Sequence, residues 1–252
     1  MAKASKTSGT SSESPRDAIV AAFMALAAEK NLPDVTLAEV AERAGVTLGE
    51  LRDAFSSRLD IIATFVKGVD RAVLDGIDAD LADQDTKEKL FDVLMRRLDV
   101  LGPHKAAIRN ITKAAMRSPP LAMALNRLAV RSHHWMLAAA GVEVAGPGGA
   151  IRAQGLAVAF GRVVRVWLDD EDPALAKTMR AMDEELARAG RAAGMLRSVE
   201  QLTAPLRSLF CAPAAFCAGR RSRRDRDRGE DRSTREEGWR GDDLRDPRVT
   251  PV

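Results

Sequence analysis

The sequence predicts an all-α protein, and three observations lead to that fold class. The composition favours helix: of the 252 residues 46% are hydrophobic and 30% charged, whereas only 4% are aromatic and Tyr is absent. No segment shows the alternation of polar and apolar residues that is typical of a strand. Apolar residues instead recur at helical spacing in segments separated by Gly and Pro. Together these observations argue against an all-β sandwich or barrel.

Composition and the positions of Gly and Pro divide the chain into four predicted parts. Residues 1–14 form a disordered arm rich in Ser, Thr and Lys, and residues 15–60 form a small three-helix unit. Residues 61–217 form a larger helical domain. Residues 218–252 form a disordered tail, because from Gly219 onward 11 Arg and 9 acidic residues accompany a single aromatic residue, Trp239.

The helices follow in order along the chain. The first begins at Pro15 with Ser14 as its cap and ends before Pro33. After the two short helices described next, longer ones are predicted at residues 58–81, 86–101, 105–117, 121–140, 150–168 and 173–193, with a shorter one at 198–216. Residues 146–149 are predicted to form a loop, and the acidic residues 169–172 to cap the helix that follows.

The most informative stretch lies between the first helix and residue 58. Thr36 and Glu39 form a capping box, and the same pattern returns eleven residues later as Thr47 and Glu50. Between them Gly45 stands where a helix ends in a left-handed residue. Two short helices joined by such a turn indicate a helix-turn-helix, although an ordinary helical hairpin fits the same pattern.

Residues 15–66 resemble the N-terminal domain of the TetR-type (tetracycline repressor-like) transcriptional regulators. The resemblance rests on Phe23, the run from Thr36 to Thr47, Gly49, Leu51, Phe55 and the segment from Ser56 to Ile62. It implies three DNA-binding helices, a helical ligand-binding and dimerisation domain, and repression relieved by a small apolar effector. It also implies that a homodimer binds double-stranded DNA at a palindromic operator.

Six residues are candidate DNA contacts. Thr36 and Thr47 are suited to phosphates, and Arg52 to guanine or phosphate. Leu48 is suited to a thymine methyl group, and Glu50 to cytosine, although its capping role explains Glu50 equally well. The full set is Thr36, Thr47, Leu48, Gly49, Glu50 and Arg52.

An alternative function follows from the charge of this unit. Residues 15–60 contain five basic and eight acidic residues, a net charge of −3. Leu48, Arg52, Asp53 and Ala54 also differ from the Lys, Tyr, His or other basic and aromatic residues common at these positions in the family. The alternative is therefore a TetR-fold accessory protein that binds a lipid or quinone and has lost DNA binding.

Large apolar residues of the middle helices are candidates for an adaptable ligand pocket, although Met and Trp at helical spacing are more often core. The set is Phe91, Met95, Met116, Met123, Trp135, Met136 and Trp167. Residues 150–168 and 173–193 are predicted to form a four-helix dimer interface with their symmetry mates. The predicted interface residues are Leu156, Phe160, Val163, Val164, Trp167, Leu175, Met179, Met182 and Leu186.

The sequence predicts no enzyme, metal site or cofactor. His133 and His134 are adjacent and point about 100° apart on a helix, so they do not form a zinc pair. The acidic residues 169–172 lack the glycine spacing of a calcium loop, and no nucleophile motif is found. No apolar run is long enough to span a membrane, and the polar N-terminus and two Cys predict a cytoplasmic protein.

Overall fold

The computed structural model of the chain describes residues 14–77 and 85–191. The predicted tail, the helix at 198–216 and the arm up to residue 13 lie outside these residues. Within them every regular element is helical, which confirms the all-α prediction. The elements are α1 (Pro15–Glu29), η1 (Leu32–Asp34), α2 (Leu37–Ala44), α3 (Leu48–Ala54), α4 (Arg58–Asp75), α5 (Thr86–Leu101), η3 (Gly102–His104), α6 (Lys105–Arg117), α7 (Pro119–Ala139), α8 (Gly146–Asp169) and a last helix over residues 176–191.

The start of each short helix forms as its sequence dictates. Both predicted capping boxes are present: Thr36 and Thr47 accept hydrogen bonds from the N3 amides, and Glu39 and Glu50 accept from the cap amides. Gly45 ends α2 with φ of 70°, the left-handed conformation that glycine adopts without strain. The helix-turn-helix prediction is therefore confirmed at the level of the backbone.

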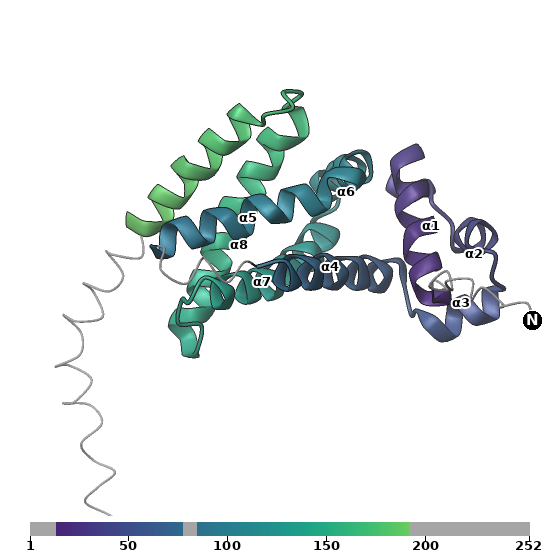
Figure 1. Cartoon of the computed structure of the whole chain (residues 1–252). Helices are drawn as coiled ribbons and strands as arrows, with labels where there is room; N and C mark the ends of the chain where they lie inside the picture. The colour runs from purple at the N-terminus through teal and green to yellow at the C-terminus, as the bar shows by residue number, and fades with distance from the viewer. Residues whose placement is uncertain (1–13, 78–84, 192–252) are drawn as a thin grey trace, which may run out of the picture. The chain divides into compact units, whose positions relative to one another are not determined.

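Two apolar clusters organise the described chain, and Figure 1 shows the helices that contribute to them. The first joins α1, α2 and α3 around buried residues such as Phe23, Val40 and Leu51. It also takes in Ile61 of α4 and Ile111 of α6, so two helices of the larger domain complete the core of the N-terminal unit. Asn110 of α6 strengthens this contact by donating hydrogen bonds to the α1 carbonyls of Ala27 and Ala28 and to that of Lys30.

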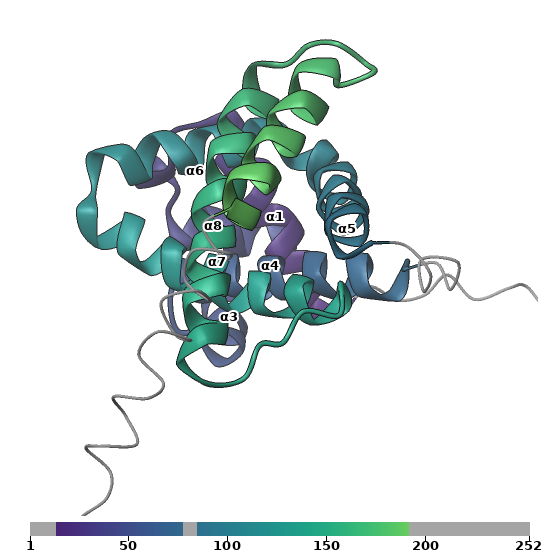
Figure 2. The ribbon, with the colours of Figure 1, turned by 90° about the vertical axis from the view of Figure 1, so that its left-hand side faces the viewer.

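The second cluster fills the bundle of α4, α5, α7, α8 and the last helix. Its buried members include Leu94, Leu98, Met136, Val163 and Met182. The last helix lies beside α8, as Figure 2 shows, and Arg162 of α8 pairs with Glu185 of that helix at 3.1 Å. These helices thus form a bundle with a core of its own.

Four predicted boundaries are wrong, and the first is the start of α7, which begins at Pro119 rather than at residue 121. Helix α4 ends at Asp75 rather than near residue 81, with Gly76 as its C-cap. Helix α8 begins at Gly146, inside the predicted loop, because Pro147 is tolerated in a first turn where its missing amide hydrogen costs nothing. Gly149 serves close packing there: a Cβ at this position would lie 1.9 Å from the carbonyl oxygen of Val144.

The last helix begins at residue 176 rather than 173. The acidic residues before it cap it as expected, because the carboxylate of Asp172 accepts hydrogen bonds from the amides of Ala174 and Ala176. The buried carboxylate of Asp170 accepts from the amide and hydroxyl of Thr178 at 2.9 and 2.7 Å.

Candidate nucleic-acid interface

Helix α3 is held by one face and presents the other to solvent. Leu51 and Phe55 are buried in the N-terminal core, which fixes the rotation of the helix about its axis. Beside that buried face, Arg52 is exposed and Leu48 is 56% exposed, an unusual position for a large apolar side chain. The arrangement displays these two side chains to a partner.

Glu39 and Glu50 are hydrogen-bonded to the threonines that cap α2 and α3. The carboxylate of Glu50 accepts hydrogen bonds from the Thr47 amide at 2.7 Å and from the Thr47 hydroxyl at 2.9 Å. These bonds lower the pKa of Glu50. Around Thr36, an ion pair with Lys30 and the cap hydrogen bonds lower the pKa of Glu39 to about 2. Both glutamates are therefore ionised and already hydrogen-bonded.

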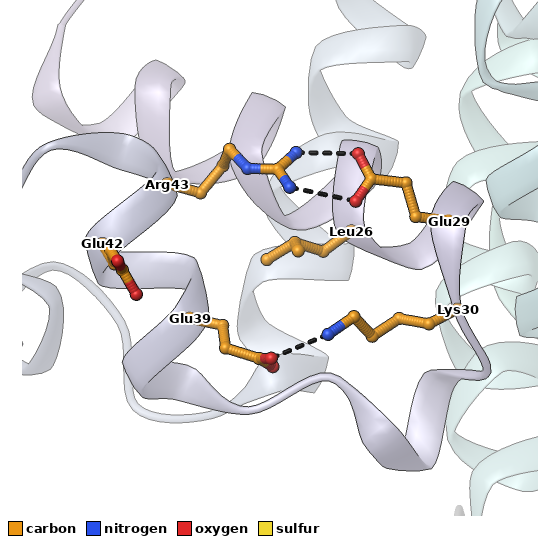
Figure 3. Close-up of a pocket in the computed structure, with 6 residues that line it drawn as sticks. All are labelled: Leu26, Glu29, Lys30, Glu39, Glu42 and Arg43. Atoms are coloured by element: carbon orange, nitrogen blue, oxygen red, sulfur yellow. Dashed lines mark hydrogen bonds and ion pairs between the residues drawn. The ribbon is translucent and has the colours of Figure 1, made fainter.

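Ion pairs fasten α2 to α1 across a surface hollow, and Figure 3 shows Leu26, which lines the hollow, between the two pairs. Arg43 of α2 donates two parallel hydrogen bonds to Glu29 of α1, at 2.8 and 2.9 Å. Lys30 pairs with Glu39 at 2.7 Å. These contacts use two of the five basic residues of the unit for internal structure.

Two more basic residues also serve internal structure. Arg16 donates to the carbonyl of Ala54 at 2.8 Å and lies over the ring of Phe55, 4.4 Å from its centre. Arg58 donates to carbonyls of the η1 segment, among them that of Leu32 at 3.0 Å. Among the described residues, Arg52 has no hydrogen-bond or ion-pair partner, so its charge remains available to a ligand.

The six candidate DNA contacts thus fall into two groups. Thr47, Leu48, Gly49, Glu50 and Arg52 lie together at the start and along α3, and all five are exposed. Thr36 is exposed at the start of α2. The internal roles of Arg16 and Arg58 escaped the sequence analysis, because their carbonyl partners are distant in the chain.

The seven candidate pocket residues do not share one environment. Met136 and Trp167 are buried in the bundle core, and Phe91 and Met95 pack against it half-buried. The other three are exposed by 70%, 58% and 54%: Met116, Met123 and Trp135.

A buried polar cluster lies within the bundle core, and no sequence pattern predicts it. Arg97 of α5 pairs with Asp70 of α4 at 2.5 Å, and the hydroxyl of Ser132 on α7 donates to the same carboxylate oxygen at 2.5 Å. His133, the next residue on α7, is 2% exposed and lies against the ring of Phe160, with 4.9 Å between ring centres. Helical spacing alone gave no signal for this cluster, since its members come from separate helices.

Among the described residues, no group of three or more His, Cys, Asp or Glu side chains is placed to hold a metal ion. In the same part of the chain no helix has the length and hydropathy needed to cross a bilayer.

The described chain is an all-α protein with a capped helix-turn-helix followed by a helical bundle. Solved structures with the same arrangement of helices identify the fold. A TetR transcriptional regulator from Nitrosomonas europaea superposes with a TM-score of 0.56 and 22% identity, over 69% of this chain and 97% of that one. A TetR transcriptional regulator from Rhodococcus superposes with a TM-score of 0.50 and 24% identity, over 69% of this chain and 95% of that one. The chain has the TetR-type fold.

No protein-family model matches the sequence, and no curated protein matches it significantly.

Proposed function

We propose that this chain is a DNA-binding transcriptional regulator of the TetR type, acting as a repressor. The observation that carries the proposal is the presentation of α3. Two capping boxes and the left-handed Gly45 fix the turn, while buried Leu51 and Phe55 orient α3 so that Leu48 and Arg52 face outward. A helix held in this way enters the major groove of B-DNA, where its side chains reach base edges.

Arg52 supplies the main polar contact in this proposal. Its guanidinium is free of internal partners within the described chain, and an Arg side chain bonds guanine in a bidentate geometry or neutralises a phosphate. Leu48 lies four residues earlier on the exposed side and packs against a thymine methyl group. Glu50 stays with its cap and contributes no base contact.

A homodimer presents two copies of α3 to the two halves of a palindrome. The residues first predicted for its interface are mostly wrong, because Leu156, Phe160, Val163, Trp167, Met182 and Leu186 are buried in the chain's own core. Exposed apolar residues remain on α8 at helical spacing: Ile151, Val158 and Val166. Gly155 and Gly161 on the same helix have open space around them, which permits close approach of a second helix.

The dimer has a direct test. Val158→Asp places a charge in the middle of this apolar stripe, so it should convert the dimer to a monomer at micromolar concentration in light scattering. Met116→Asp, at an exposed apolar site on α6, is the matched control and should leave the dimer intact. A monomeric wild-type protein contradicts the proposed assembly.

A small, mostly apolar effector is proposed to bind in the bundle core, near Met136, Trp167, Phe91 and Met95. Its signal reaches α3 through α6, because Asn110 and Ile111 of α6 bond and pack against the N-terminal unit. A shift of α6 therefore changes the separation of the two α3 helices in the dimer.

The experiment that tests the proposed function is binding of the full chain to DNA. We expect the purified protein to retard a fragment from upstream of its own gene at moderate salt, and to prefer it over a scrambled fragment of equal length. Equal affinity for both fragments contradicts a regulator that reads sequence.

The second candidate is a TetR-fold protein that binds a lipid or quinone-like molecule and no DNA. The observation that favours it is the net charge of −3 over residues 15–60, where four of the five basic residues are engaged internally. A failure to bind any DNA at low salt, with ligand binding intact, supports this function over the first.

A further inference from the structure

The polar cluster of the bundle core contains two nitrogen atoms that lack partners. Nε of Arg97 and Nε2 of His133 have no hydrogen-bond partner within the described chain. Both residues are buried, with exposed fractions of 5% and 2%. Buried polar atoms in native proteins are nearly always hydrogen-bonded, and an unpaired one is costly. The rest of the cluster is well paired, so the two orphans stand out.

The side chains that carry these two atoms lie beside the same aromatic ring. The ring of Phe160 lies 4.9 Å from the centre of the His133 ring and 5.8 Å from the guanidinium carbon of Arg97. The walls around them are apolar, since Phe160, Met136, Leu94 and Leu98 belong to the same buried cluster. A polar group bonded to either nitrogen is therefore surrounded by apolar side chains.

The hydrogen-bonding roles of the two atoms are opposite. Nδ1 of His133 lies 2.7 Å from the carbonyl oxygen of Ala129, which can only accept, so Nδ1 carries the hydrogen. Burial, and then the charge of Arg97, lower the pKa of His133 to about 3, so the ring is neutral. Its Nε2 is consequently a bare acceptor, whereas Nε of Arg97 is a donor.

We propose that this cluster is the polar anchor of a ligand site, which binds the hydroxyl group of an otherwise apolar alcohol or phenol. The hydroxyl hydrogen donates to Nε2 of His133 and the hydroxyl oxygen accepts from Nε of Arg97. A hydroxyl group fits because it is both donor and acceptor at one atom. The apolar body of the ligand packs against Phe160 and Met136.

A carboxylate does not fit this site. It accepts from Arg97, but it offers no hydrogen to Nε2 of His133, and Asp70 already neutralises the Arg97 charge at 2.5 Å. The site therefore selects a hydroxyl over a carboxylate on the same apolar body. That this ligand is the effector of a regulator rests on the proposed function. That the cluster binds a hydroxyl compound does not depend on that function.

The test compares three probes of matched shape on the full chain in the absence of DNA: 4-butylphenol, n-butylbenzene and 4-butylbenzoate. Calorimetry should show 4-butylphenol binding about tenfold more tightly than either of the others, which corresponds to two hydrogen bonds that each contribute about threefold. Nitrogen NMR gives a second readout, because the chain has only three His residues. The Nε2 resonance of His133 should move on adding 4-butylphenol and stay in place with n-butylbenzene.

His133→Phe keeps a ring of similar size and removes the acceptor. It should reduce the preference for 4-butylphenol over n-butylbenzene to about threefold or less, leaving the Arg97 donor alone. His134→Phe, at the neighbouring half-buried position, is the matched control and should keep the tenfold preference.

Equal affinities of the wild type for 4-butylphenol and n-butylbenzene overturn the proposal. An unmoved Nε2 resonance does so too, and indicates that water alone satisfies the cluster. Loss of DNA binding is a separate result. A chain that selects the phenol and binds no DNA keeps the ligand site and loses the regulator function.

Discussion

The N-terminal unit and the bundle of the described chain differ in where their polar side chains lie. In the N-terminal unit the core is apolar, and the polar side chains form caps and ion pairs at the surface, as between Arg43 and Glu29. In the bundle, Arg97, Ser132 and His133 lie inside the core, and two of their nitrogen atoms have no partner within the described residues.

This difference indicates different tasks. Fully paired surface caps fix one backbone geometry, which suits the binding to a rigid duplex that we propose. A core that contains unpaired polar atoms sacrifices stability, and such atoms gain partners when a polar ligand binds. We therefore propose that the N-terminal unit is rigid and that the bundle responds to a ligand.

The largest effect is expected from breaking the buried ion pair of the bundle. Asp70→Ala leaves the Arg97 guanidinium buried and unpaired, which should lower the free energy of unfolding by about 3–5 kcal/mol. Urea denaturation measures this loss. Asp75→Ala, an exposed acid at the end of α4, should change it by less than about 0.5 kcal/mol. Equal losses in the two variants contradict a buried pair.

The pH dependence of stability should separate the two regions. His133 stays neutral when folded, with a pKa of about 3, whereas the unfolded imidazole titrates near 6.5. The unfolded state therefore binds more protons between these values, so stability is full above pH 6.5 and falls as the pH drops. The expected loss between pH 6.5 and pH 5 is about 2 kcal/mol.

The caps of the N-terminal unit titrate in a lower window. The pKa of Glu39 is lowered from 4.5 to about 2, and the pKa of Glu50 is also lowered, so their contribution disappears only as the pH falls below 4.5. Urea denaturation at pH 7 and pH 5 tests the comparison. His133→Phe should remove most of the pH dependence in this range, and an unchanged slope in that variant contradicts a buried neutral ring.

A smaller effect is expected at the caps themselves. Thr47→Ala removes the side chain that accepts from the Glu50 amide, which should cost about 1 kcal/mol of stability. Thr47→Ser keeps the hydroxyl and should cost much less. The thermal midpoint measures both changes. A loss in the Ser variant as large as in the Ala variant indicates that the methyl group, rather than the cap, stabilises this turn.

The same contrast explains what the sequence predicts well. The helix-turn-helix is encoded locally, since the capping boxes and Gly45 involve residues within three or four positions of one another. The sequence therefore predicts the caps and the glycine of this turn at their observed positions. It does not predict the end of α4 or the start of α8. Arg96 packs close to Gly76 and Val144 packs close to Gly149, and the helical pattern does not record such contacts.

Contacts between side chains and residues distant in the chain also could not be predicted from the sequence. Arg16 and Arg58 look like free surface charges in the sequence, whereas in the structure they bond carbonyls 38 and 26 residues away. The sequence also grouped Trp135 with Met136 as pocket residues, although adjacent residues on a helix point in different directions. Met136 is buried and Trp135 is 54% exposed.

The most direct test of the central claim is a salt series of DNA binding by wild type, Arg52→Ala and the control Arg131→Ala, which removes an exposed Arg of α7. Fluorescence anisotropy with the upstream fragment gives the affinities. Arg52→Ala should lose about 1–3 kcal/mol of specific affinity if Arg52 contacts a base, or about one unit of salt slope if it contacts phosphate. Arg131→Ala should match the wild type. Identical binding by all three proteins, or no binding by any of them, contradicts the claim that α3 reads DNA through Arg52.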